Sequence, residues 1–192
     1  MKTNSKASRK QKGATLIEAL VSIVVMSFGL LGLAGLQVNA MAYQQSAWAT
    51  QRVAELTSNF SERLRTNTGA VYSDYIYSEN YQAGNADAPT VLGCRTSGTC
   101  TAAQIAADDI ADVLTKAQSI LPGGSIQVEG TADNGFVFTA LYFDKQFVDS
   151  TGALQTSASC SASTSGIDWR NCCPVAAAAP AGVRCRRFAI IP

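Results

Sequence analysis

The chain has 192 residues, a formal net charge of +1 and no histidine. The charge is uneven, because the first thirteen residues carry five basic side chains and no acid, which leaves the remainder mildly acidic. A mildly acidic body argues against a dedicated nucleic-acid binder. Without histidine, a nucleophile elbow or a phosphate-binding glycine loop, the chain is not expected to be an enzyme or to hold a cofactor or metal.

An apolar run follows the polar, basic leader of residues 1–13. From Ala19 to Val38 twenty residues carry no charge, and at 1.5 Å per residue a helix of this length spans about 30 Å, the thickness of a hydrocarbon core. The basic leader is expected to stay in the cytoplasm while the remainder crosses. Small residues allow helices to approach closely in lipid, and three glycines recur in this run: Gly29, Gly32 and Gly35.

Glu18 is a carboxylate just inside the apolar run. A charged side chain costs roughly 2.5–3.5 kcal/mol at the bilayer centre on insertion scales, and less near an end. One interpretation is that Glu18 reaches the headgroups. The other is that it pairs with the terminal amine of a neighbouring parallel helix and sets the axial register; after a cut behind Gly13, Glu18 is the fifth residue of the new chain.

The string KGATLIEAL, residues 12–20, resembles the prepilin N-terminal methylation motif of type IV pilins and type II secretion pseudopilins. The resemblance implies cleavage by prepilin peptidase between Gly13 and Ala14, and N-methylation of Ala14. It assigns Glu18, together with Thr15, to assembly and register. The family usually has phenylalanine where this chain has Ala14, and many major pilins carry a proline in the helix, which this run lacks.

The string SFGLLGLAGLQ, with the later cysteines and LPGG, narrows the resemblance to PilV-type minor pilins, the type IV pilus modification proteins. This implies an α+β type IV pilin fold, with a long N-terminal helix on a small antiparallel sheet and a short second helix. The implied function is non-catalytic: pilus assembly or modification, with priming, twitching motility and adhesion. The implied partners are other minor and major pilins, prepilin peptidase, the inner-membrane assembly platform and the lipid bilayer.

The expected organisation has four parts: a cleaved leader at 1–13, a transmembrane and assembly helix at 14–38, its amphipathic continuation at 39–66, and a periplasmic head domain with disulfides at 67–192. The protein would reside in the bacterial inner membrane with its N-terminus cytoplasmic, and then in the pilus at the cell surface. Two alternatives remain open, a type II secretion pseudopilin and a bitopic, membrane-anchored binding protein.

Helical periodicity continues beyond the apolar run, and no proline or glycine interrupts it until Gly69. One helix from about residue 15 to 66 is predicted, with a break near Gln37 as the alternative. An apolar stripe marks its inner face: Met41, Ala42, Gln45, Ala49, Val53, Leu56, Phe60 and Leu64. Charged residues mark the wetter face: Arg52, Glu55, Glu62, Arg63 and Arg65.

All six cysteines lie beyond the apolar run: Cys94, Cys100, Cys160, Cys172, Cys173 and Cys185. An even number on one side of a membrane segment predicts disulfides in an oxidising compartment, with reduced thiols or a metal site as alternatives. We expect a local bridge between Cys94 and Cys100. The other four are expected to pair Cys160 and Cys185 with the adjacent Cys172 and Cys173, in an order that the sequence leaves open.

Residues 68–99 predict a long surface connection, rich in turn-forming residues. Its tyrosines are expected to pack the loop onto the body rather than form a binding patch: Tyr72, Tyr75, Tyr77 and Tyr81. The capping-box pattern from Thr101 to Gln104 then predicts a helix to about Ser119, ended by LPGG. Three carboxylates on it are interpreted as a solvated face rather than a calcium site: Asp108, Asp109 and Asp112.

Three strands are predicted after this helix, at 125–129, 136–144 and 183–191. The second is apolar on both faces, so it should be central, with the long helix on one side and loop or second-helix residues on the other. Residues 149–182 have a flexible composition, but their cysteines should staple them to the body. Three arginines of the last strand are interpreted as an exposed strand face rather than a contact for an anionic partner: Arg184, Arg186 and Arg187.

Overall fold

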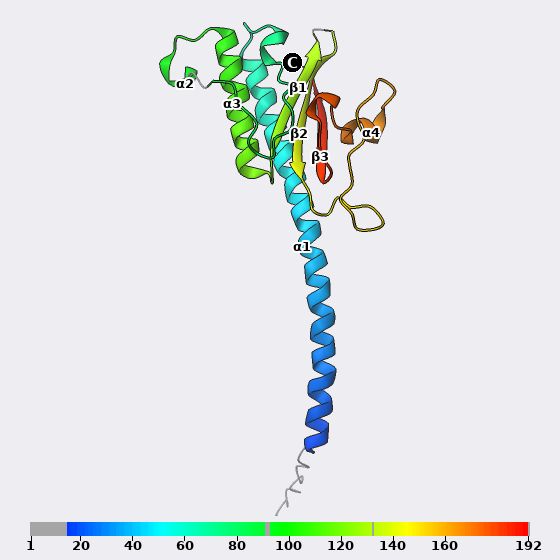
Figure 1. Cartoon of the computed structure of the whole chain (residues 1–192). Helices are drawn as coiled ribbons and strands as arrows, with labels where there is room; N and C mark the ends of the chain where they lie inside the picture. The colour runs from blue at the N-terminus through cyan, green and yellow to red at the C-terminus, as the bar shows by residue number, and fades with distance from the viewer. Residues whose placement is uncertain (1–14, 91–92, 132, 192) are drawn as a thin grey trace, which may run out of the picture. The chain divides into compact units, whose positions relative to one another are not determined.

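The computed structural model describes residues 15–90, 93–131 and 133–191. It divides into two compact units, Met1–Gln44 and Gln45–Pro192. The elements in chain order (Figure 1) are α1 (Leu16–Thr66), the 3₁₀ turn η1 (Tyr72–Tyr75), α2 (Cys94–Ser97), α3 (Ala102–Ile120), β1 (Ser125–Thr131), β2 (Gly135–Phe143), α4 (Gly166–Asn171), the 3₁₀ turn η2 (Val175–Ala177) and β3 (Val183–Ile190). This set of helices with one small antiparallel sheet confirms the predicted α+β class.

Helix α1 runs from Leu16 to Thr66 without the alternative break near Gln37. Its predicted apolar stripe is buried from Ala49 onward, at every fourth or third residue through Val53, Leu56, Phe60 and Leu64. The earlier members of the stripe are not buried, since Met41 and Gln45 are exposed. The amphipathic pattern therefore describes the part of α1 that packs within the second unit.

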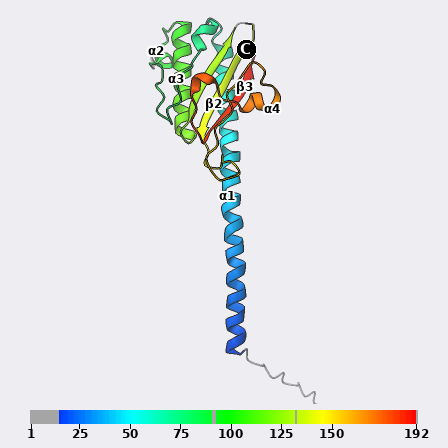
Figure 2. The same cartoon turned by 45° about the vertical axis from the view of Figure 1, so that its right-hand side comes forward.

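The sheet is antiparallel in the order β1-β2-β3, so β2 is central, as its two apolar faces predict. One face of β2 contributes Phe138 and Tyr142 to the main core, which also contains Leu56 of α1 and Leu114 of α3. Both helices therefore cover the same face of the sheet (Figures 1 and 2). The opposite face is covered by loop residues, because Leu141 packs with Cys173, Ala177 and Cys185.

Helix α3 begins and ends as predicted. The Thr101 hydroxyl accepts the Gln104 N–H, and the Gln104 side chain accepts the Thr101 N–H, which completes the capping box. LPGG ends the helix, and Gly123 has a φ of +58° with the Tyr81 hydroxyl 2.6 Å from where a Cβ would stand. Tyr81 donates to the Gly123 carbonyl at 2.7 Å, so the glycine allows both the turn and the approach of the loop.

The loop after α1 is held by its tyrosines, which confirms the packing interpretation. Tyr75 is 2% exposed and meets the Phe60 ring edge-on at 5.9 Å. Tyr72 stacks on Phe136 with ring centroids 4.5 Å apart. The backbone of Tyr77 pairs with Val128 of β1 in both directions, at 3.0 and 2.7 Å.

Three disulfides are present: Cys94–Cys100, Cys160–Cys172 and Cys173–Cys185. The last two give the order that the sequence left open, and they tie residues 149–182 to β3 and to one another. Two short elements that the sequence does not predict lie inside the loops that these bridges close. Helix α4 lies between Cys160 and Cys172, and η2 lies between Cys173 and Cys185. Figure 1 shows α4 beyond β3, on the side away from β2.

The interpretation of the last-strand arginines as an exposed face is wrong, because Arg184 and Arg186 are half-buried and Arg187 is buried. Arg187 is 9% exposed and forms an ion pair with Glu129 at 3.1 Å. Its guanidinium also lies 4.8 Å from the centre of the Trp169 ring. Arg184 forms an ion pair with Asp144 at 2.8 Å. Both partners come from segments distant in sequence, so the local strand pattern contains no sign of them.

Candidate functional site

The N-terminal segment holds the residues that the sequence singles out for assembly. Gly13, Ala14 and the leader lie outside the described residues. The carbonyl of Thr15 accepts the N–H of Glu18 at 3.0 Å and of Ala19 at 3.2 Å, and so starts α1. Glu18 lies in the first turn with its side chain exposed.

The surface of α1 beyond Glu18 is apolar and without cover in its own unit. Its large apolar side chains are exposed to between 52% at Val24 and 88% at Leu16. Polar side chains in this stretch bond to their own helix, since the Ser22 and Ser27 hydroxyls donate to the carbonyls of Glu18 and Val24 at 2.7 Å each. Such internal satisfaction suits a helix in a medium that offers no hydrogen bonds.

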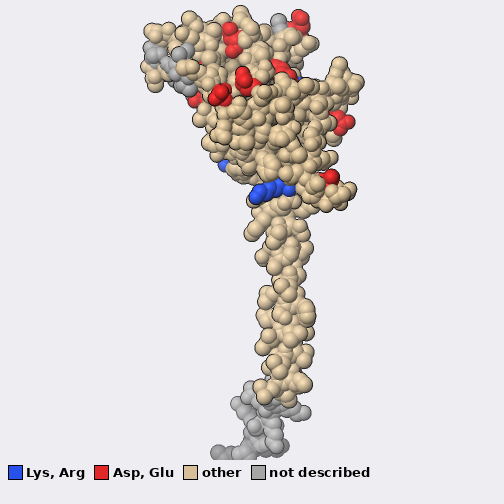
Figure 3. All heavy atoms as spheres, in the orientation of Figure 1, with Lys and Arg blue, Asp and Glu red and all other residues tan. Residues whose placement is uncertain are grey.

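This stretch of α1 is long and apolar enough to cross a membrane, by length and composition, with a mean hydropathy of 2.3 in its best window. Figure 3 shows no charged side chain on the face it draws between the grey residues and the globular unit. Glu18 is the only charged residue between residues 16 and 51. None of the described residues forms an ion pair with it, so its carboxylate is available to a group from outside the chain.

The three glycines of this stretch provide close access to the helix backbone. A Cβ built at Gly29, Gly32 or Gly35 meets no atom within 4 Å. Packing against the residues that the structure describes therefore does not require glycine at these positions. Small residues on a lipid-facing helix are typical of surfaces where a second helix approaches.

Residues 8–34 match the prokaryotic N-terminal methylation motif. The matched residues include the predicted cleavage site, Glu18 and most of the apolar run, and the motif supports a type IV pilin-like protein. The long helix with a second helix and a small antiparallel sheet is consistent with the type IV pilin fold. Comparison with curated proteins gives no match, and comparison with solved structures gives none either.

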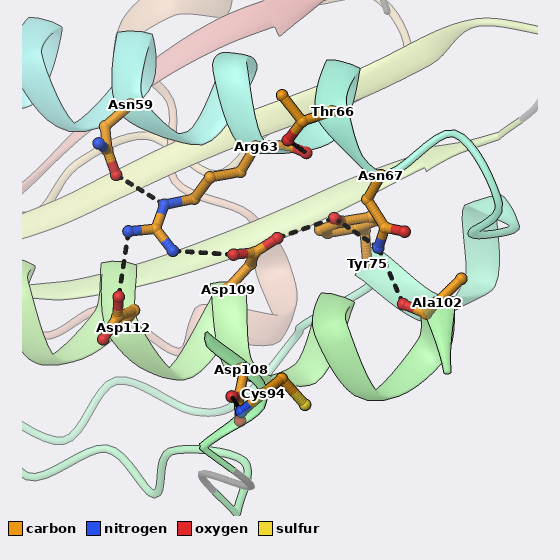
Figure 4. A network of polar contacts seen from close by, with 10 residues as sticks. All are labelled: Asn59, Arg63, Thr66, Asn67, Tyr75, Cys94, Ala102, Asp108, Asp109 and Asp112. Carbon is orange, nitrogen blue, oxygen red and sulfur yellow. Dashed lines mark hydrogen bonds and ion pairs between the residues drawn. The ribbon is translucent and has the colours of Figure 1, made fainter. Parts of the chain in front are cut away.

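A second cluster of ionisable groups lies in the second unit (Figure 4). It corrects the interpretation of a solvated acidic face for Asp108 and Asp109, which are buried, whereas Asp112 is exposed as expected. Arg63 of α1 donates to Asp109 at 2.8 Å and to Asp112 at 3.0 Å. The Tyr75 hydroxyl donates to the other oxygen of Asp109 at 3.0 Å. Asp108 accepts the backbone N–H of Cys94 at 2.7 Å. Arg63, which was expected on the wetter face, has a side chain only 16% exposed.

Burial of Asp109 raises the pKa of its carboxyl, while the bonds from Tyr75 and Arg63 act in the opposite direction. Burial also raises the pKa of Tyr75 above its ordinary range and that of Tyr77 to about 12. The two oxygens of Asp109 are both occupied by side chains of the protein. The cluster therefore acts as a polar clamp that joins α1, η1 and α3. No local sequence pattern predicts it, because Arg63 and Asp109 are 46 residues apart.

Proposed function

We propose that this chain is a minor pilin of the PilV type, a non-catalytic subunit that takes part in the assembly or modification of a type IV pilus. The observation that carries the proposal is the methylation motif at residues 8–34. It lies on the N-terminal stretch of α1, where the large apolar side chains are exposed and Glu18, the one charged residue between residues 16 and 51, forms no ion pair with a described residue.

The proposed maturation begins with prepilin peptidase, which cuts between Gly13 and Ala14. The cut removes all five basic residues of the leader and creates a positively charged amine at Ala14, which is then methylated. Residues 14–38 remain as the transmembrane and assembly helix, residues 39–66 continue it, and residues 67–192 form the periplasmic head domain. The three disulfides support an oxidising compartment for that domain.

Transfer of the helix from the bilayer into a fibre brings little hydrophobic gain, because lipid tails are as apolar as the side chains that would replace them. Close packing and polar pairing must therefore supply the specificity. We assign close packing to the glycine positions. We assign register to Glu18, assisted by Thr15, since a buried carboxylate is stabilised only where a neighbour's amine lies at its level.

The protein would wait in the inner membrane as a single-pass subunit and leave it for the pilus at the cell surface. Its partners would be other minor and major pilins, with the assembly platform acting on the membrane-resident form. Priming of assembly, twitching motility and adhesion are the processes in which we place it. The absence of histidine among its residues fits a structural role.

The experiment that tests this function is Glu18→Ala in the chain's own cells. Membrane insertion should be unchanged, because removal of a charge does not weaken a spanning helix. Incorporation into sheared surface fibres should fall to background. Glu62→Ala is the matched control, since Glu62 is an exposed carboxylate on the same helix outside the motif, and it should leave incorporation unchanged. Normal incorporation of Glu18→Ala would refute the register role.

A type II secretion pseudopilin is the nearest alternative, because the motif supports pilus and pseudopilus systems alike. Deletion of the gene separates the two functions. Loss of surface fibres with normal enzyme secretion supports the minor pilin, whereas loss of secreted enzymes with normal fibres supports the pseudopilin. A bitopic binding protein, in which the helix is only an anchor, predicts that neither changes.

A further inference from the structure

Three arginines of the second unit form no ion pair with any carboxylate that the structure describes. Of the arginines whose side chains the structure describes, four form ion pairs: Arg52, Arg63, Arg184 and Arg187. The others form none: Arg65, Arg170 and Arg186. The acids nearest to them in sequence, Glu62 and Asp168, are exposed and form no ion pair with them among the described residues.

These three arginines line one continuous depression, which we call the β3 groove. Its wider part has a volume of about 620 Å³ and is lined by Thr50, Trp169, Arg170, Arg186 and Arg187, the last of which is the one paired with Glu129. Its narrower part has a volume of about 340 Å³ and contains Arg65. Phe188 and Ala189 of β3 line both parts, so the two parts adjoin along the strand.

The β3 groove is long and narrow, with a helix as one wall and a strand as the other. Along α1 it extends from Thr50 to Arg65, a rise of about 22 Å for a helix. Along β3 it extends from Arg186 to Ile191, about 17 Å for a strand. The helix wall consists of small residues that let a backbone approach: Ala54, Thr57, Ser58 and Ser61. An extended segment of about six residues matches this length.

The wide end of the β3 groove is electropositive and aromatic. Among the described residues, Arg186 donates to the neutral amide of Asn171 and to no carboxylate. Arg187, the next residue of β3, is 9% exposed, and its buried Nε–H has no hydrogen-bond partner among the described residues. Arg170 is exposed on α4 beside Trp169. Guanidinium groups present forked donors that suit carboxylates.

We propose that the β3 groove binds an extended acidic peptide segment of a partner protein. Alternate side chains of an extended segment lie about 7 Å apart on one face, so several carboxylates can face Arg170, Arg186 and Arg65 in turn. The proposal explains why unpaired guanidinium groups gather along one groove of a chain whose other described arginines are paired. It does not depend on the proposed pilus function.

The test is a fluorescence titration of the full chain in detergent micelles. The chain has two tryptophans, so Trp48→Phe leaves Trp169 as the only indole, inside the β3 groove. The probe is a blocked peptide of about six residues that alternates glutamate and valine. The matched probe replaces each glutamate by glutamine, and an oligogalacturonate of equal charge represents an acidic saccharide.

The glutamate peptide should change Trp169 fluorescence saturably at low ionic strength, and the glutamine peptide should not. Arg65→Gln, Arg170→Gln and Arg186→Gln should each weaken binding about two- to fivefold. Arg52→Gln, in an exposed ion pair outside the groove, should leave binding unchanged. No saturable change, equal binding of the glutamine peptide, an equal loss with Arg52→Gln, or tighter binding of the oligogalacturonate would each overturn the proposal.

Discussion

At the scale of single residues, Arg63 determines how three distant segments meet. It is a helix residue with the sequence context of a surface position, yet it reaches two carboxylates of α3 while Asn59 accepts from its Nε at 2.8 Å. Asn67 then links the Tyr75 hydroxyl to the Ala102 carbonyl at 3.0 and 2.8 Å. The bond between Tyr75 and Asp109 is the buried part of this network, so removal of the Asp109 carboxylate leaves the buried Tyr75 hydroxyl without its acceptor.

Asp109→Ala should lower the free energy of unfolding by about 3 kcal/mol. The substitution leaves Arg63 with one carboxylate partner, Asp112, and removes the acceptor of the Tyr75 hydroxyl. Urea titration of the full chain in detergent measures this. Asp112→Ala is the matched control, since it removes the other carboxylate of the same arginine from a side chain that is 47% exposed. The Asp112 variant should lose clearly less stability; equal losses would contradict the clamp.

The raised pKa of Asp109 predicts a pH dependence with a definite sign. The folded state binds this proton more tightly than the unfolded state, whose ordinary pKa is 3.8. The stabilisation is therefore present at low pH and is lost as the pH rises through the folded pKa. The stability difference between the wild type and Asp109→Asn should fall as the pH increases from below 3.8. A difference that grows with pH would show that Arg63 outweighs burial.

At the scale of elements, α1 has one secondary structure and two kinds of surface. Its residues from Ala49 to Leu64 include the buried stripe of the second unit, with Val53, Leu56 and Phe60 fully buried. Its residues from Leu16 to Val38 are exposed. The first surface is explained by the chain's own core. The second has no cover among the described residues, and its length and apolar composition suit a membrane span.

Leu56→Ala and Leu33→Ala should separate these two surfaces. Leu56 is 0% exposed and Leu33 is 56% exposed. We expect Leu56→Ala to destabilise the second unit by about 3 kcal/mol through the cavity it creates. Leu33→Ala should leave that unit's unfolding unchanged, because it removes no contact there. Differential scanning calorimetry of the full chain measures both. A comparable loss from Leu33→Ala would mean that the exposed stretch helps to stabilise the core.

Elements with a local signal could be predicted from the sequence, and those that depend on distant partners could not. The capping box at Thr101, the LPGG stop and the apolar strand Phe136–Phe143 each carry their own signal, and each was predicted. The sequence predicts that Asp109 and Arg187 face solvent, because charged residues at such positions in a helix or strand are mostly exposed. Their partners, Arg63 and Glu129, are 46 and 58 residues away, and only the folded arrangement of α1, α3 and the sheet brings them together.

The region from 149 to 182 was the hardest to predict, since its composition is that of a linker. The sequence indicated that cysteines would hold it, but adjacent Cys172 and Cys173 left two pairings open. The structure bonds Cys173 to Cys185 of β3, on the face of the sheet opposite the helices. The composition predicts a flexible segment, whereas the two disulfides hold residues 149–182 in place in the folded chain.

Removal of the Cys173–Cys185 bridge should loosen this region selectively. The bridge closes a short loop, and such cross-links contribute about 3 kcal/mol in the chain-entropy account. Hydrogen exchange of Cys173→Ala/Cys185→Ala should increase over residues 149–182 while α3 keeps its protection. Cys94→Ala/Cys100→Ala is the control and should affect only the loop before α3. Unchanged exchange in 149–182 would show that packing alone holds the region.

At the scale of the whole molecule, the protein combines a disulfide-bonded α+β unit with an exposed apolar helix that carries a methylation motif. The disulfides suit an oxidising compartment, and the apolar helix suits a membrane or a bundle of like helices. The proposed cleavage makes the helix an assembly element, because it places a charged amine about one turn from Glu18.

The most direct test of the central claim is the mature N-terminus of the protein purified from its own cells, read by intact-mass and peptide mass spectrometry. The account predicts a chain that begins at N-methylated Ala14, with residues 1–13 absent. A chain that begins at Met1 or Lys2 would contradict it and would leave the helix as an ordinary membrane anchor.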